Sequence, residues 1–123
     1  MLTVAPVFTV VNVATAIDWY EQVLGFRASF RNEPDGPESV FYAVLRCGQV
    51  GIHLVRAAAM GSAPGEGAGA FDVDNYGALV SACKSAGAAF YIEPDTPIPT
   101  GARSFGVLDP DGNKLLFIKE PAA

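Results

Sequence analysis

The spacing of apolar residues changes along the start of the chain and predicts a strand followed by a helix. An apolar run over 7–13 is rich in Val and Phe, which is typical of a β-strand. Apolar side chains then recur at helical spacing, and those expected on one helical face are Ile17, Tyr20 and Leu24. Thr15 is expected to cap the start of this helix, with Asp18 three residues on, and Gly25 is expected to end it.

Three further strands are predicted after this helix. They cover 26–32, 39–46 and 49–57, and the turn-forming stretches EPDGPE and CG divide them. A run of small residues, 58–67, predicts a linker. The same order then returns as a strand over 69–75, a helix over 76–87, and strands over 88–95, 102–108 and 114–120.

The two halves match at one offset of 63 residues. The matched pairs are Val10 with Val73, Asn12 with Asn75, Val44 with Val107, Leu45 with Leu108, Ile52 with Leu115, Leu54 with Phe117 and Val55 with Ile118. Chance matching among abundant apolar residues is the alternative, but helices and turns also recur in the same order. The pattern therefore predicts an α+β fold of two tandem βαβββ modules, with repeats over 1–57 and 68–120 in a single domain 1–123.

Strand alternation divides the apolar residues between two faces of each sheet. The face expected to pack on the helices and form the core carries Phe8, Val10, Ile52, Leu54, Phe71, Val73, Leu115 and Phe117. The other face carries Ala5, Val7, Thr9, His53, Ala68, Asp72 and Leu116. If the two sheets curve toward each other, this second set lines a crevice.

Composition narrows the function classes. The chain has 123 residues, of which 50% are hydrophobic and 17% charged, as expected for one globular domain. A net charge of −5 argues against nucleic acid, because phosphate binding requires clustered Lys and Arg. No apolar run reaches the roughly 20 residues needed to span a bilayer, and the start of the chain has no basic segment. Two cysteines indicate buried thiols in a cytoplasmic protein rather than a disulfide scaffold.

Two segments resemble a known family. VVNVATAIDWYEQVLGF (10–26) resembles the opening of vicinal oxygen chelate proteins, and GARSFGVLDPDGN (101–113) resembles their closing hairpin. This superfamily includes glyoxalases, bleomycin-resistance proteins and extradiol dioxygenases. The resemblance implies a curved mixed sheet around a crevice. The likeness to bleomycin-resistance proteins implies a homodimer with its crevices between the subunits.

The resemblance also places four metal-ligand positions, at Ala5, His53, Ala68 and Leu116. Only His53 can ligate a metal, whereas a catalytic zinc needs about three protein ligands. We therefore expect no metal and no cofactor, and these positions favour a binding protein over an enzyme. The DPDGN stretch is expected to be a hairpin turn, because Lys114 stands where a calcium loop requires Gly.

Six residues are candidates for ligand contact. Phe30 and Phe41 align with aromatics that bleomycin-resistance proteins use to hold planar groups, although ordinary packing explains such rings equally well. His53, Asp72 and Leu116 share the predicted crevice face. Arg103 is interpreted as either a donor in the crevice wall or a structural partner of a carboxylate.

These observations favour metal-independent binding or sequestration of a hydrophobic or aromatic small molecule, as in antibiotic resistance. The acidic net charge leaves a cationic ligand open as well. The alternative is a vicinal oxygen chelate enzyme of the lyase, isomerase or dioxygenase type with an atypical site around His53. A third interpretation has another protein, rather than a small ligand, in the crevice.

Overall fold

The first half of the chain folds into a four-stranded mixed sheet with one helix against it. The structure, a computed structural model, describes residues 1–60 and 63–120. The strand order is β1-β4-β3-β2, with β1 parallel to β4 and the other neighbours antiparallel. The elements are β1 (Val7–Val10), α1 (Val13–Leu24), β2 (Arg27–Asn32), a 3-10 turn η1 (Pro37–Ser39), β3 (Tyr42–Cys47) and β4 (Val50–Arg56).

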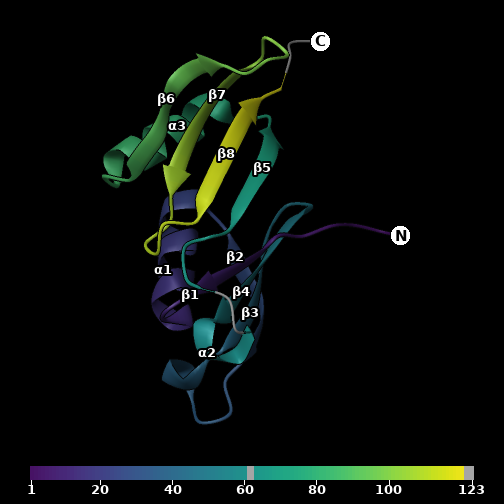
Figure 1. The fold of residues 1–123 in the computed structure, drawn as a ribbon, viewed down its shortest axis with the longest axis vertical. Coiled ribbons are helices and arrows are strands. Elements are labelled where there is room, and N and C mark those ends of the chain that lie inside the picture. Colours follow the sequence, from purple (N-terminus) through teal and green to yellow (C-terminus); the bar gives the residue numbers. More distant parts are fainter. Residues whose placement is uncertain (61–62, 121–123) are drawn as a thin grey trace.

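The second half repeats this arrangement, and Figure 1 shows the two sheets one above the other. Its strand order is β5-β8-β7-β6, with β5 parallel to β8 and the other neighbours antiparallel. The elements are β5 (Ala68–Val73), α3 (Tyr76–Ser85), β6 (Ala89–Pro97), β7 (Arg103–Leu108) and β8 (Lys114–Lys119). The α+β class and the order βαβββ in each half are therefore confirmed.

The predicted linker, 58–67, begins with ordered structure. A short helix, α2 (Ala57–Met60), follows β4 directly and takes the first residues that we expected to be linker. Among the described residues, no helix has the length and apolar character required to cross a bilayer.

The start of α1 differs from the prediction. Asn12, not Thr15, is the N-cap: its side-chain oxygen accepts a hydrogen bond from the Thr15 backbone N–H at 3.0 Å. The first strand ends at Val10 because the chain turns into this cap. The predicted end of the helix is confirmed, since Gly25 adopts the left-handed conformation (φ 78°) that glycine reaches without strain.

The pairing of the strands shows that the offset between the halves is not constant. Val7 pairs with His53 and Ala70 with Leu116, an offset of 63 in both strands (70 − 7 and 116 − 53). In the inner strands, however, Leu45 pairs with Ile52 and Val107 pairs with Leu115, so β3 and β7 differ by 62 (107 − 45).

The predicted equivalences of Val44 with Val107 and of Leu45 with Leu108 are therefore wrong by one residue. The left-handed glycines after the two helices, Gly25 and Gly87, are already 62 apart, so the second half loses one residue at the end of its helix. It regains that residue in the longer turn between β7 and β8.

The core is one cluster drawn from both halves. The expected core face is confirmed: Phe8, Val10, Ile52, Leu54, Phe71, Leu115 and Phe117 are each at most 8% exposed, and Val73 packs partly buried against them. Both helices contribute to this cluster through Ile17, Tyr20, Leu79 and Cys83. The helix-covered faces of the two sheets therefore point into a shared interior.

A buried carboxylate in the turn between β7 and β8 joins the halves. Asp109, 4% exposed, accepts hydrogen bonds from the Asp111 and Asn113 backbone N–H groups (2.9 Å each) and from the Asn113 side chain (2.8 Å). Its fourth donor is the Tyr20 hydroxyl of α1, at 2.9 Å, from the other half. The DPDGN stretch is thus a turn, as predicted, and also a contact between halves.

Other residues of this turn form hydrogen bonds with β1 and the residue after it. The Asn113 side chain donates to the Thr9 carbonyl and accepts from the Gly67 N–H, and the Asp111 carboxylate accepts from the Val11 N–H. Gly65 is needed beside it, because a Cβ there would lie 2.0 Å from the Asp111 carbonyl oxygen. The turn therefore contacts α1, β1 and the segment before β5 at once.

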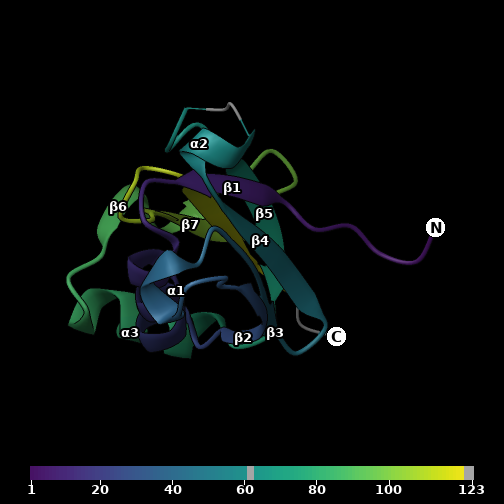
Figure 2. The same cartoon turned by 90° about the horizontal axis from the view of Figure 1, so that it is seen from below.

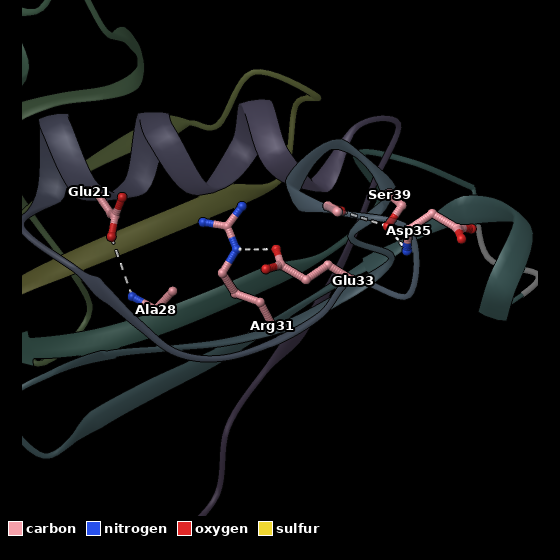
Figure 3. A network of polar contacts seen from close by, with 7 residues as sticks. Glu21, Ala28, Arg31, Glu33, Asp35 and Ser39 are labelled. Atoms are coloured by element: carbon pink, nitrogen blue, oxygen red, sulfur yellow. Dashed lines mark hydrogen bonds and ion pairs between the residues drawn. The ribbon is translucent and has the colours of Figure 1, made fainter.

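Polar contacts also hold the connection between β2 and β3, which Figure 3 shows from close by. Arg31 forms an ion pair with Glu33 at 3.1 Å. The Ser39 hydroxyl accepts from the Asp35 N–H and donates to the Gly36 carbonyl, which closes the loop on itself. This connection borders the end of β2 that carries Phe30.

Replacing Tyr20 with Phe is expected to lower the free energy of unfolding by about 2 kcal/mol, since it leaves a buried carboxylate with one donor fewer. Urea denaturation measures the loss. The control is Tyr91→Phe, which deletes a hydroxyl from a ring that is 37% exposed and is expected to cost under about 0.5 kcal/mol. Equal losses in the two variants would contradict the role of the contact.

The same pair of variants tests the pH dependence. Burial, followed by the nearby Asp109 charge and hydrogen bond, raises the pKa of Tyr20 far above its usual value. The folded chain therefore keeps a proton that the unfolded chain releases above about pH 10, so stability falls as pH rises beyond that point. Tyr20→Phe is expected to lose less stability than the unchanged protein over that range.

Candidate functional site

The face of the first sheet that points away from α1 carries a row of side chains across all four strands. Val7 pairs with His53, His53 with Val44, and Val44 with Phe30. Paired residues project from the same face of a sheet, so these four form one line. Val7 is 45% exposed and Phe30 is 52% exposed. We call this surface the open face of the first sheet.

A bulge places Phe30 on this face. Ala28 pairs with Leu45 on the core side, and plain alternation would put Phe30 on that side too. The register shifts between Ala28 and Phe30, so Ser29 is an extra residue and Phe30 turns to the open face opposite Val44. The bulge therefore exposes an aromatic ring that would otherwise lie in the core.

His53 is held by a tyrosine that the sequence did not single out. The Tyr42 hydroxyl is hydrogen-bonded to His53 Nδ1, and the two rings meet edge to face with centroids 5.5 Å apart. When the phenol donates, Nδ1 accepts, and the proton of the neutral imidazole lies on Nε2. The open face thus has one polar pair beside Val44 and Phe30. Tyr42 could have been found from the sequence, because it lies two residues before Val44 on the same strand.

Two of the predicted contact residues lie elsewhere. Phe41 lies two residues before Ala43, which packs in the core, so its side chain projects toward the same side of the sheet. The Arg56 guanidinium lies 5.9 Å from the centre of the Phe41 ring. Arg103 donates a hydrogen bond to the Asp95 carbonyl at 3.2 Å. It lies two residues before buried Phe105 and therefore projects from the same face of β7. Neither side chain shares the open face with Phe30 and His53.

The remaining two predicted residues lie on the corresponding face of the second sheet. Leu116 pairs with Ala70 and Gly106. Asp72 lies two residues after Ala70, pairs with Ile118 and projects from the same face. A Cβ on Gly106 would lie 2.6 Å from the Tyr91 ring, so that ring covers the glycine. Leu116 therefore stands on the second sheet where His53 stands on the first.

The two open faces do not cover each other. Over residues 1–60 and 63–120, no strand of one sheet packs broadly on a strand of the other. The structure brings Phe30 together with His53, and Asp72 together with Leu116. It does not bring these two pairs into one site within a chain.

The donor set does not fit a metal centre. Of the four positions that the resemblance assigns to metal ligands, Ala5, Ala68 and Leu116 offer no donor atom and only His53 does. In the described part of the chain, no three His, Cys, Asp or Glu side chains lie close enough to hold an ion. Since zinc sites use about three protein ligands or more, no chemical step can be routed through a metal here.

Comparison with known proteins places these features in a family. A family model described as the Glyoxalase/Bleomycin resistance protein/Dioxygenase superfamily matches residues 4–117. Among curated proteins there is no match. A solved virulence protein from Salmonella typhimurium is 27% identical over 94% of this chain and 93% of that one, with a TM-score of 0.69.

Two further solved structures share the fold. The bleomycin-binding protein of bleomycin-producing Streptomyces verticillus, complexed with copper(II)-bleomycin, is 23% identical over 98% of both chains, with a TM-score of 0.75. The bleomycin resistance determinant encoded on transposon Tn5 is 18% identical over 99% of this chain and 100% of that one, with a TM-score of 0.76.

The donor set generates a prediction about metal content. Protein purified without a histidine tag is expected to carry zinc, nickel, iron and manganese far below one equivalent per chain, because a lone imidazole cannot offset the dehydration of the ion. Elemental analysis measures this, with His53→Ala as the comparison. One equivalent of metal that disappears in His53→Ala would refute the prediction.

Proposed function

Because this chain belongs to the glyoxalase/bleomycin resistance protein/dioxygenase superfamily, we propose that it binds a hydrophobic or aromatic small molecule on the open face of the first sheet without using a metal ion. The observation that carries the proposal is the exposed Phe30 ring, turned out of the core by the bulge at Ser29. Turning an aromatic ring outward loses core burial, and contact with a ligand offsets that loss.

The chemistry of this face suits a planar ligand. Phe30 offers a large surface for stacking, and Val7 and Val44 provide apolar contact beside it. The His53–Tyr42 pair adds one oriented polar group, and Arg46, which lies on the same face of β3 as Val44, adds a positive charge. Ligand sites commonly combine a mostly apolar wall with a few placed polar groups. Sequestration of such a compound, as in antibiotic resistance, is the role we assign to this binding.

A second copy of the chain completes the site in this proposal. One open face alone is a flat wall, and a crevice needs a second one. The second sheet of another copy offers Ala70, Leu116 and Tyr91 for this purpose. We therefore propose a homodimer in which the first sheet of each copy faces the second sheet of the other.

The start of the chain supports this assembly. Residues 1–4 extend away from the body of the molecule, as the arm that ends at the N-terminus in Figure 2 shows, whereas the Pro6 carbonyl already accepts a hydrogen bond from the His53 N–H. This arm is apolar and exposed, with Met1, Leu2 and Val4 each at least 88% exposed. In this structure β1 itself pairs with β4 of its own chain, so the arm before it is the part left to contact a second copy.

Catalysis at His53 is the second candidate. The Tyr42 hydrogen bond orients the imidazole so that Nε2 is available to a bound molecule, as a general base or a donor would require. Mass spectrometry of a bound compound separates the two functions. An unaltered compound supports binding, whereas a product that forms with this protein and not with His53→Ala supports catalysis.

Replacing Phe30 with Ala is expected to weaken the affinity for a planar aromatic ligand at least about tenfold, or about 1.4 kcal/mol, through the loss of stacking. A thermal-shift screen of planar natural products selects the ligand, and calorimetry measures its affinity. Phe41→Ala is the matched control, because that ring lies on the other side of the sheet. Similar affinities in Phe30→Ala and the unchanged protein would count against the site.

Light scattering is expected to give twice the mass of one chain at micromolar concentration. Val7→Lys is expected to give monomers, since it introduces a charge on the open face. Val11→Lys alters a valine that is 65% exposed beyond the end of β1 and should leave the dimer intact. An unchanged protein that stays monomeric would exclude the proposed assembly.

A further inference from the structure

A cavity of about 430 Å³ lies where the two halves meet, away from the open face of the first sheet. On one side it is bounded by the end of α1 and by the hairpin turn Cys47–Val50. On the other side it is bounded by the end of β5, the start of α3 and the end of β8. Its volume falls in the range of about 300–1,000 Å³ that is usual for small-molecule sites.

The floor of the cavity is apolar and largely aromatic. It is formed by Leu24, Phe26, Phe71, Leu79 and Phe117, all of which belong to the shared core. The Phe71 and Phe117 rings stack with centroids 5.6 Å apart. Such a floor favours an apolar body, and the faces of aromatic rings also attract a cation.

The rim of the cavity is acidic. Asp74 and Glu120, which follow the ends of β5 and β8, line it, and among the described residues no Lys, Arg or His does. Asp72 also borders the cavity, but its side chain shares the outer face of the second sheet with Leu116. The start of α3 adds a partial positive charge of about half an elementary charge near Asn75. The two carboxylates outweigh that contribution, so the field at the opening of the cavity is negative.

We propose that this cavity is a second binding site, which takes a small hydrophobic cation such as an arylalkyl amine. The apolar body lies on the aromatic floor, and the ammonium group lies at the opening beside the carboxylates of Asp74 and Glu120. The site lies within one chain, so it does not require the proposed dimer.

Cys47 provides a reporter for occupancy. Its thiol is exposed, so the expectation of two buried cysteines is wrong for this residue, and it lines the cavity. The other thiol, Cys83, is fully buried, and burial raises its pKa to about 11, so it stays protonated and unreactive near neutral pH. Alkylation by iodoacetamide therefore reports on Cys47 alone, and a molecule in the cavity is expected to slow it.

The probe is 1-naphthylmethylamine, with 1-naphthylmethanol and 1-naphthoate as neutral and anionic counterparts. Calorimetry on the full chain is expected to show saturable binding of the amine, about tenfold tighter than the alcohol, and weakest binding of the carboxylate. The amine is also expected to slow alkylation of Cys47 at least threefold. Its affinity should fall as salt is added, because the attraction is between exposed charges.

The double variant Asp74→Asn and Glu120→Gln is expected to lose about tenfold in affinity for the amine, because it removes both carboxylates at the opening of the cavity. Glu38→Gln, in the 3-10 turn far from this rim, removes one negative charge and serves as the control. Melting curves of all variants confirm that each one folds.

Equal binding of amine, alcohol and carboxylate would overturn the proposal, as would an amine affinity unchanged in the double variant. Absence of saturable binding, or binding that leaves Cys47 equally reactive, would overturn it too. Phe30→Ala should leave amine binding unchanged, because that ring lies on the open face. Failure of this site therefore leaves the proposed function of the open face untouched, and the reverse also holds.

Discussion

The hydrogen bonds to the buried Asp109 carboxylate determine how the two sheets lie relative to each other. A carboxylate that is 4% exposed requires its charge to be compensated, and here four donors do so without a basic partner. Because one donor is the Tyr20 hydroxyl of α1, forming the turn and docking the halves are a single event. Asn113 extends the contact to β1 through the Thr9 carbonyl.

Joining the halves in this way commits the helix-covered faces to one interior and turns the other two faces outward. The outward faces are then free to evolve for binding, since their side chains contribute little to the shared core. On the first sheet this freedom is visible in Phe30 and in the His53–Tyr42 pair. Where the two halves meet, their packing leaves a cavity, and its aromatic floor is formed by residues that also belong to the core.

Local patterns in the sequence predicted the elements and the core face, because alternation and helical spacing are properties of neighbouring residues. The turn at 109–113 and the helix end at Gly25 were predictable for the same reason. The face of Phe30 was not, since it depends on a bulge of one residue at Ser29. Nor was the partner of Tyr20, which lies 89 residues along the chain. For helix capping, Thr15 and Asn12 both fit the local pattern, and only the backbone path selected Asn12.

The one-residue difference between the two closing turns makes the repeats unequal. In the first hairpin Cys47 stands where the second has Asp109, and in the second helix Cys83 stands where the first has Tyr20. Each half therefore holds one component of the contact and lacks the other. Two first halves would have tyrosines without an acceptor, and two second halves would have carboxylates without a phenol. The two halves are therefore complementary, and neither can replace the other. The contact forms only in a chain that contains one half of each kind.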